Sequence, residues 1–196
     1  MTTYYFSKEQ NSELNLKKIK ANILSENFEF YVGSGVFSKS KIDKGTEVLL
    51  NSVFIKPEWK ILDLGCGYGA IGIILKKVYP DAIVTMVDIN KRALKLAKMN
   101  VNLNNVDVRV MESDLYAKVQ TQFDTIVVNP PQKAGKQLCF KIIEDAKEHL
   151  KDKGLLQLVG RHNKGGKTLE KKMLSVFGNV KSASKKSGYR VYVSEK

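Results

Sequence analysis

The stretch Ile61-Leu62-Asp63-Leu64-Gly65-Cys66-Gly67-Tyr68-Gly69 joins a short apolar run to a turn that contains three glycines. The run predicts a buried strand from Ile61 to Leu64, and the periodicity that follows predicts a helix over residues 70–78. Glycine adopts positive φ and lets a ligand approach the main chain, while the first turn of a helix offers free N–H groups. This order of elements predicts a ligand-binding turn at the carboxyl end of a strand.

Short apolar runs and amphipathic stretches continue to alternate after this turn. They predict strands over residues 82–87, 106–111, 123–128 and 155–159, and helices over residues 91–102, 137–150 and 168–177. Residues 179–184 and 189–193 predict a C-terminal hairpin whose last strand joins the sheet antiparallel. The pattern predicts the α/β class with a Rossmann-like, mostly parallel seven-stranded sheet, helices on both faces and right-handed crossovers.

The first 57 residues differ from the rest in their pattern. Residues 14–24 and 28–32 flank Ser25-Glu26-Asn27 and predict a β-hairpin, which a glycine-rich loop at Gly33-Ser34-Gly35 follows. Asp43 then opens a predicted helix that runs through Val53. We therefore expect an N-terminal extension, residues 1–57, that packs on a core domain of residues 58–196.

Composition limits the class of protein further. Hydrophobic residues make up 43% of the 196 residues and charged residues 27%, as in a globular domain, and no apolar run approaches the roughly 18 residues of a membrane span. No signal peptide is visible, and the spacing of Cys66 and Cys139 is not that of a metal site. We expect a reduced, cytoplasmic protein without a metal or a membrane partner.

The net charge of +13 is unevenly distributed. Residues 133–196 contain 16 Lys or Arg against 6 Asp or Glu, whereas residues 1–132 contain 17 against 14. A basic surface attracts a polyanion, because neutralised phosphates release counterions. The alternative is a Lys-rich solvated surface without a partner, but the asymmetry favours nucleic acid.

Acidic residues follow the predicted strands. Asp88 closes the second strand of the core, where a carboxylate can accept hydrogen bonds from two ribose hydroxyls, and Asp114 follows the third strand. Because the carboxyl ends of parallel strands meet at one edge of the sheet, we expect both residues to face one crevice with the glycine turn. The sequence therefore predicts a nucleoside-binding crevice.

Two nucleoside cofactors fit this pattern. Residues 67–72 read Gly-Tyr-Gly-Ala-Ile-Gly and satisfy the dinucleotide fingerprint of NAD enzymes, with Asp88 in the expected region. Asp63, however, places a carboxylate before the turn, where it disfavours a pyrophosphate and favours a cationic ligand. S-adenosylmethionine carries a sulfonium and an ammonium group, so the acidic residue favours this methyl donor over NAD.

Asn129-Pro130-Pro131 ends the apolar run of residues 123–128. Proline cannot donate to a sheet and biases the preceding residue toward extended backbone, so the strand must stop at Asn129. Two prolines leave carbonyl oxygens unpaired beside an amide side chain, and such a cup of acceptors suits an NH2 group. A strand end without any chemistry is the alternative that this motif leaves open when it is taken alone.

Taken together, Asp63-Leu64-Gly65-Cys66-Gly67-Tyr68-Gly69, Asp88, Asp114 and Asn129-Pro130-Pro131 resemble the motifs of class I S-adenosylmethionine-dependent methyltransferases that modify exocyclic amines. Residues 34–38 (Ser-Gly-Val-Phe-Ser) and 41–46 (Lys-Ile-Asp-Lys-Gly-Thr) look more specifically like the RsmC-type ribosomal RNA guanine-N2 methyltransferases and their small archaeal and bacterial relatives. The resemblance covers roughly residues 28–196.

The resemblance implies roles for single residues. Gly65, Gly67 and Gly69 would line the methionine part of the donor with Asp63 facing its amino group, Asp88 would bind the ribose, and Asp114 and Leu115 the adenine. Cys66, Ile89 and Asn129 are further candidates for contacts with the donor. Asn129 and the Pro130 carbonyl, with Pro131 behind them, would hold the target NH2 toward the sulfonium methyl. An aryl amine is a poor nucleophile, so acceptors that favour its tetrahedral geometry help more than a general base.

The sequence departs from the family in one position. An aromatic residue that stacks on a flipped base often follows the two prolines, but Gln132 occupies this position. We expect Phe37 or Tyr68 to stack on the base, or Gln132 to bind its edge, so guanine and adenine both remain possible. Lys133, Lys136 and Arg161 are further candidates for contacts with the substrate.

These observations predict S-adenosylmethionine-dependent methyl transfer to an exocyclic base amine of RNA, with guanine-N2 of small-subunit ribosomal RNA as the first choice. The partner would be ribosomal RNA or a ribosomal assembly intermediate. The same chemistry on adenine of RNA or DNA, or on a protein glutamine amide, is the alternative acceptor class. A non-catalytic RNA-binding or assembly module is the alternative from another class.

Overall fold

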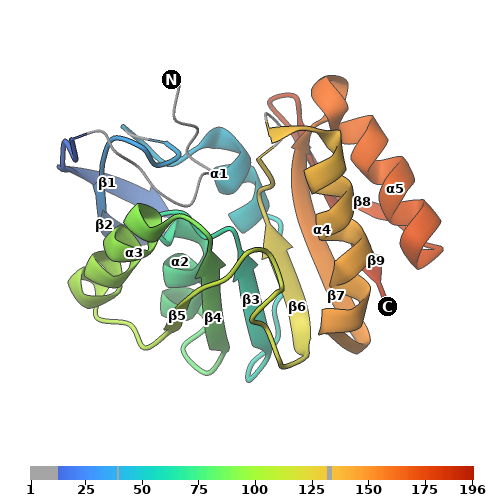
Figure 1. The fold of residues 1–196 in the computed structure, drawn as a ribbon, viewed down its shortest axis with the longest axis horizontal. Helices are drawn as coiled ribbons and strands as arrows, with labels where there is room; N and C mark the ends of the chain where they lie inside the picture. The colour runs from blue at the N-terminus through green and yellow to red at the C-terminus, as the bar shows by residue number, and fades with distance from the viewer. Residues whose placement is uncertain (1–12, 39, 132–133) are drawn as a thin grey trace.

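The computed structural model describes residues 13–38, 40–131 and 134–196. Within them, seven strands form one sheet in the order β5-β4-β3-β6-β7-β9-β8 (Figure 1). The strands are β3 (Lys60–Leu64), β4 (Ile83–Asp88), β5 (Arg109–Glu112), β6 (Phe123–Val128), β7 (Leu150–Arg161), β8 (Lys181–Lys186) and β9 (Tyr189–Glu195). The first five are mutually parallel, and β9 inserts antiparallel between β7 and β8. The predicted fold class and the antiparallel C-terminal hairpin are confirmed.

Helices cover both faces of this sheet. The helices are α1 (Lys44–Leu50), α2 (Ala70–Val78), α3 (Lys91–Asn104), α4 (Lys136–His149) and α5 (Lys167–Phe177). One core cluster joins α1, α2 and α3 to the sheet, and a second joins α4 and α5 to the opposite face. Neighbouring strand residues alternate between the two clusters, as Ile61 and Leu62 do. The alternation explains why the central strands read as continuous apolar runs.

The N-terminal segment forms a two-stranded antiparallel sheet of β1 (Lys17–Ile23) and β2 (Glu26–Val32). The turn is shorter than predicted, because Glu26 and Asn27 already pair with β1 and only Leu24 and Ser25 reverse the chain, both at positive φ. Asn100 of α3 binds both the N–H and the carbonyl of Tyr31. The N-terminal sheet also shares a core cluster with α2, α3 and the large sheet. The predicted division between residues 57 and 58 stays a prediction.

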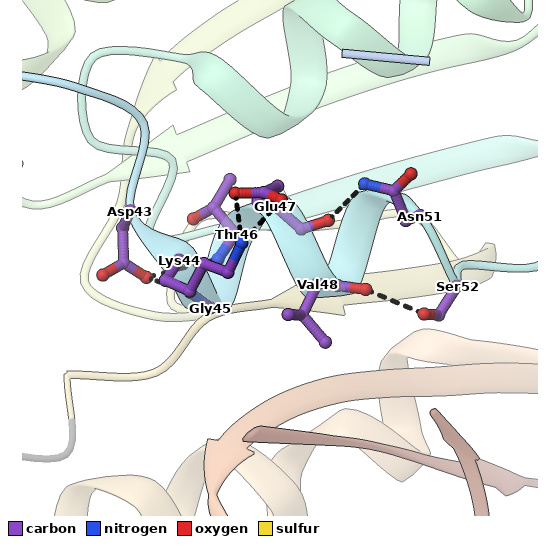
Figure 2. A network of polar contacts seen from close by, with 8 residues as sticks. All are labelled: Asp43, Lys44, Gly45, Thr46, Glu47, Val48, Asn51 and Ser52. Atoms are coloured by element: carbon purple, nitrogen blue, oxygen red, sulfur yellow. Dashed lines mark hydrogen bonds and ion pairs between the residues drawn. The ribbon is translucent and has the colours of Figure 1, made fainter. Parts of the chain in front are cut away.

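The end of α1 and the start of β5 differ from the predicted residues, and local hydrogen bonds explain both differences. Helix α1 ends at Leu50 rather than Val53, because the side chains of Asn51 and Ser52 take up the Glu47 and Val48 carbonyls (Figure 2). Strand β5 begins at Arg109 rather than at residue 106, since Val106 still closes the end of α3 through its N–H bond to Val101. Both corrections concern the capping of a helix end.

Strand β7 is also longer than predicted. It covers twelve residues rather than five, and its register against β6 shifts between Phe123 and Thr125. Lys153, at φ 61°, and Gly154 lie in this irregular part. The polar sequence of residues 151–154 does not predict a strand. Among the described residues, no helix is both long and apolar enough to cross a membrane.

Candidate active site

A cavity of about 560 Å³ lies at the carboxyl edge of the sheet. The loops after β3, β4, β5 and β6 form its floor, and the N-terminal segment, α1 and the start of β9 contribute walls. In Figure 1, α1 lies at the end of the sheet toward which the arrowheads of β3 and β6 point. Twelve predicted site residues line this cavity: Phe37, Gly65, Cys66, Gly67, Asp88, Ile89, Asp114, Leu115, Asn129, Pro130, Pro131 and Arg161.

Three predicted residues lie elsewhere. Asp63 is fully buried beneath the glycine turn, and Gly69 packs against the core, where an added Cβ would lie 3.0 Å from Ile73 Cδ1. The Lys136 ammonium lies 5.0 Å from the ring centre of Phe140 on its own helix. Their expected contacts with ligands stay predictions. The predictions for Gln132 and Lys133 lie outside the described residues.

The glycine turn after β3 presents bare backbone to the cavity. Gly65 and Gly67 have φ values of 72° and 59°, and a Cβ added to either would meet nothing within 4 Å. Positive φ disfavours other residues here, and the open space would be filled by their side chains. The main chain of this turn is therefore accessible to a ligand in the cavity.

Asp88 links the glycine turn to the end of β4. Its Oδ2 accepts a hydrogen bond from the Gly67 N–H at 2.8 Å, and its Oδ1 accepts one from the Asn90 N–H at 2.8 Å. Burial raises the pKa of Asp88, while the hydrogen bonds from backbone N–H groups oppose the shift. A carboxylate at this place suits neutral hydroxyl donors such as those of a ribose.

Asp63 is the most perturbed carboxyl group near the cavity. Burial raises its pKa to about 7, the Gly72 N–H bond to Oδ2 at 2.9 Å lowers it, and the charge of Asp88 raises it further. Among the described residues, no group donates to Asp63 Oδ1, although this atom is buried. An unpartnered acidic oxygen under the turn favours a cationic ligand above it, as the sulfonium and ammonium of S-adenosylmethionine are.

We expect Asp63 to make the stability of the free protein depend on pH. A carboxyl group whose pKa is raised on folding stabilises the folded state below its unfolded pKa, and this contribution is lost as the pH rises through the folded pKa. From this group alone, the free energy of unfolding should fall by up to about 4 kcal/mol between about pH 4 and pH 7. Urea unfolding of wild type and Asp63→Asn at several pH values measures this, and equal pH slopes would contradict it.

Asn129 is held from the N-terminal side of the cavity. Its Nδ2 donates to Asp43 Oδ2 at 3.0 Å and to Thr46 Oγ1 at 3.0 Å. Asp43 is the N-cap of α1, and the same Oδ2 accepts from the N–H groups of Gly45 and Thr46 (Figure 2). Since an ionised carboxylate only accepts hydrogen bonds, the amide nitrogen must face Asp43. Asn129 Oδ1 is thereby left as an acceptor.

Sequence analysis missed part of this wall. Asp43 and Thr46 line the cavity, although the sequence pointed to Asp43 only as a helix start and to residues 41–46 only as a family motif without assigned roles. Tyr189 lines it as well, with the Arg161 guanidinium 5.3 Å from its ring centre. The cap signature at residues 43–46 marks the helix, but no local pattern shows that it meets Asn129, which is 86 positions away.

Cys66 is the one cysteine among the described residues that line the cavity. Cys66 is 8% exposed, and burial raises the pKa of its thiol. A neutral thiol is a weak nucleophile, so Cys66 fits a space-filling role. The described residues include no group of three or more His, Cys, Asp or Glu side chains that could hold a metal ion. The chemistry of the cavity therefore rests on its hydrogen-bond acceptors, such as Asp88 and Asn129 Oδ1, and on the exposed backbone of the glycine turn.

A parallel sheet with this glycine turn, an acidic residue after the next strand and an amide before two prolines is the architecture of Rossmann-like S-adenosylmethionine-dependent methyltransferases. The profile of the family described as "Methyltransferase small domain" matches residues 27–193. The chain belongs to this family. The choice of a methyltransferase over an NAD enzyme is thus confirmed, and the residues present fit S-adenosylmethionine.

Individual relatives agree with this assignment. The Bacillus subtilis uncharacterized protein YbxB is 35% identical over 201 residues, which cover all of both chains. The ribosomal RNA small subunit methyltransferase C of Haemophilus influenzae strain PittEE is 37% identical over 163 residues, 80% of this chain and 49% of the relative. The chain spans about half the length of such relatives.

Solved structures give the same fold. Thermus thermophilus RsmC, a 16S rRNA methyltransferase in complex with AdoMet and guanosine, superposes with a TM-score of 0.82 at 24% identity. The match covers 96% of this chain and 52% of that chain. A methyltransferase from Pyrococcus furiosus matches with a TM-score of 0.67 at 23% identity, over 76% of this chain and 80% of that one.

Proposed function

We propose that the protein transfers a methyl group from S-adenosylmethionine to the exocyclic amine of an RNA base, namely guanine-N2 of small-subunit ribosomal RNA. The observation that carries this proposal is the orientation of Asn129. Asp43 and Thr46 hold its amide nitrogen, so its Oδ1 is available to accept a hydrogen bond at the cavity wall. An exocyclic amine can donate such a bond and still use its nitrogen lone pair to react. A hydroxyl or thiol nucleophile would in addition need a base to take its proton.

The residues that would bind the donor form the other side of the cavity. Asp88 would accept hydrogen bonds from the ribose, Asp114 and Leu115 would border the adenine, and the Gly65–Gly67 backbone would lie along the methionine part. When bound, S-adenosylmethionine supplies an electrophilic methyl group. The protein then has to hold a nitrogen beside it, and no described residue needs to act as a nucleophile.

Asn129 Oδ1 and the Pro130 carbonyl would orient the target nitrogen. No donor within the described residues bonds to either oxygen, whereas the Pro131 carbonyl accepts the Ala134 N–H at 2.7 Å. Two N–H bonds to these acceptors would favour tetrahedral geometry, which localises the lone pair on nitrogen and directs it to the methyl group. The proton that the amine loses after transfer can pass to solvent.

Guanine is the favoured base because of the relatives that the chain resembles. They include proteins named for ribosomal RNA methylation, and the T. thermophilus structure was determined with guanosine bound. Phe37 lines the cavity and is 38% exposed, so it can stack on a flipped base, whereas Tyr68 is 4% exposed and packs edge-on against Phe30. Ribosomal RNA as the substrate also implies a cytoplasmic location.

Transfer of labelled methyl to ribosomal RNA or small ribosomal subunits from a strain that lacks the gene tests the proposal. Nuclease digestion should release the label as N2-methylguanosine. Label recovered in methylated adenosine would show that adenine is the methylated base. Label that stays in the macromolecular fraction after nuclease digestion but is released by protease would support a protein glutamine as the acceptor. Binding of the donor without transfer to any of these acceptors would contradict methyl transfer and favour the non-catalytic module.

Asp43 and Thr46 act as positioning residues in this proposal, and paired substitutions can test this. Asp43→Ser keeps a good N-cap but is too short to reach Asn129, so kcat should fall by about tenfold while the melting temperature stays near the wild-type value. Thr46→Val should lower kcat by several-fold, since it removes one of two acceptors, and Thr46→Ser should restore it. KM for the donor should not change.

A different pattern would show a merely structural role for these residues. Loss of stability and of kcat in parallel in Asp43→Ser, or equal kcat values for Thr46→Val and Thr46→Ser, would contradict positioning. Pre-steady-state measurement of the transfer step excludes an effect on product release.

A further inference from the structure

Six basic residues lie on neighbouring elements beside the part of the cavity that Arg161 and Tyr189 line. They come from the end of β7, the π-helical segment η2 (His162–Gly166), the start of α5, the end of β8 and the start of β9. The residues are Arg161, Lys164, Lys167, Lys185, Lys186 and Arg190, and we call this set the basic rim. All except the half-buried Arg190 are exposed.

Backbone pairing holds the members of the basic rim together. Arg190 lies opposite Gly160 on one side and Lys185 on the other, and the His162 N–H donates to the Gly188 carbonyl at 2.9 Å. The pKa of His162 is lowered, first by burial and then by the charges of Arg190 and Lys167. Residues 160–190 contain nine Lys or Arg and one acidic residue, Glu170. The rim is therefore a concentrated positive field.

The basic rim is continuous with the proposed acceptor site. Arg161 belongs to the rim and also lines the cavity, where its guanidinium lies over the ring of Tyr189. Arg161 and Tyr189 are paired residues of β7 and β9, and Arg190 follows directly. A base that enters the cavity would bring its neighbouring phosphates to this place.

The position of two lysines is unfavourable for the free protein. Lys164 and Lys167 lie at the N-terminal end of α5, where the helix dipole favours negative charge, and α5 has no side-chain cap. Only Glu170 complements the dipole in the first turn. A surface selected for stability or solubility alone would place acidic residues here. An anion bound to the rim would offset the unfavourable interaction of these two lysines with the dipole of α5.

We propose that the basic rim binds the phosphate backbone of the RNA on one side of the methylated nucleotide. This inference rests on the proposed function, since it takes RNA as the substrate. The rim combines a row of positive charges with a cavity for a single base, which suits a polynucleotide better than an acidic peptide or a membrane. Affinity would then come from the rim and the choice of base from the cavity.

Two triple variants test this surface. Lys164→Gln, Lys167→Gln and Lys185→Gln remove three of the six positive charges of the rim at residues that do not line the cavity. Lys60→Gln, Lys77→Gln and Lys153→Gln remove the same charge from exposed sites at the amino ends of β3 and β7 and the end of α2. Binding of a fluorescein-labelled stem–loop RNA is measured for both variants and for wild type over a range of salt concentrations.

The rim variant should bind the RNA at least about tenfold more weakly, and the slope of log K against log salt should shrink by about 0.7 to 0.9 for each lost contact. The control variant should bind like wild type. The melting temperature of the rim variant should equal or exceed that of wild type, and its affinity for the donor should not change. Equal affinity and equal salt slopes for the two triple variants would overturn the inference.

Methyl-transfer kinetics of wild type and the rim variant, measured beside the binding data, separate this inference from the proposed function. If wild type binds the RNA through the rim but transfers methyl to no RNA, only the proposed function fails. If it transfers methyl to RNA and the rim variant has an unchanged KM for RNA, only the rim fails. Wild type that does not bind RNA at all would overturn the rim as a binding surface.

Discussion

Asn129→Ala is expected to lower kcat for methyl transfer by about 100- to 1,000-fold. The variant removes the acceptor that would hold the amine at the wall of the cavity, and the Pro130 carbonyl alone cannot fix its orientation. Donor binding should be unaffected to within about twofold, because Asp88 and the glycine turn are unchanged. Single-turnover transfer of labelled methyl, combined with calorimetry of donor binding, measures both quantities.

Asn51→Ala is a matched control for this prediction. Asn51 is also an asparagine whose Nδ2 donates to a neighbouring group, the Glu47 carbonyl, but it lies at the other end of α1 (Figure 2). The control variant should retain the kcat of wild type. If Asn129→Ala retained more than about a tenth of wild-type kcat, Asn129 would not be the acceptor that the proposed function requires.

Asp88→Ala should weaken donor binding by about 100-fold. Two hydrogen bonds to a charged group contribute about 3 kcal/mol together, which corresponds to this factor. The variant also releases the Gly67 N–H, which Asp88 holds at 2.8 Å, so the backbone of the turn should become less ordered. Calorimetric titration with S-adenosylmethionine and with its product gives the affinities.

The exposed residue Asp81 provides the comparison for Asp88, because it lies before β4, at the opposite end of that strand. Asp81→Ala should bind the donor like wild type. An Asp88→Ala variant with wild-type affinity for the donor would show that the ribose is not bound at the end of β4.

The donor side of the cavity was predictable because its determinants are local. Each strand reads as an apolar run, and the residues that follow it must lie at one edge once the sheet is parallel. Gly65, Gly67, Asp88 and Asp114 were found in this way, and all four line the cavity. Asp63 was also identified, but the alternation of side chains along β3 turns it into the core, so that it can act only through the turn above it.

The acceptor side was harder to predict because its contacts are not local. The pairing of Asp43 with Asn129 joins the N-terminal segment to the middle of the sheet, and only the packing of α1 on β7 and β9 brings them together. Tyr189 reaches the cavity because β9 lies beside β7. The sequence predicts that this strand joins the sheet antiparallel, but it does not predict which strand lies next to it. Boundaries at helix ends and at the irregular part of β7 depend on single side chains and on register.

One oxygen atom of Asp43 has two roles, since Oδ2 caps the N-terminus of α1 and also accepts a hydrogen bond from the amide of Asn129. The wall that would receive the substrate is therefore completed only when the N-terminal segment has docked on the sheet. The glycine turn and Asp88, which we propose to bind the donor, belong to the central strands and do not take part in this contact. The ability to orient an acceptor would therefore depend on a contact between segments that lie 86 positions apart in the chain.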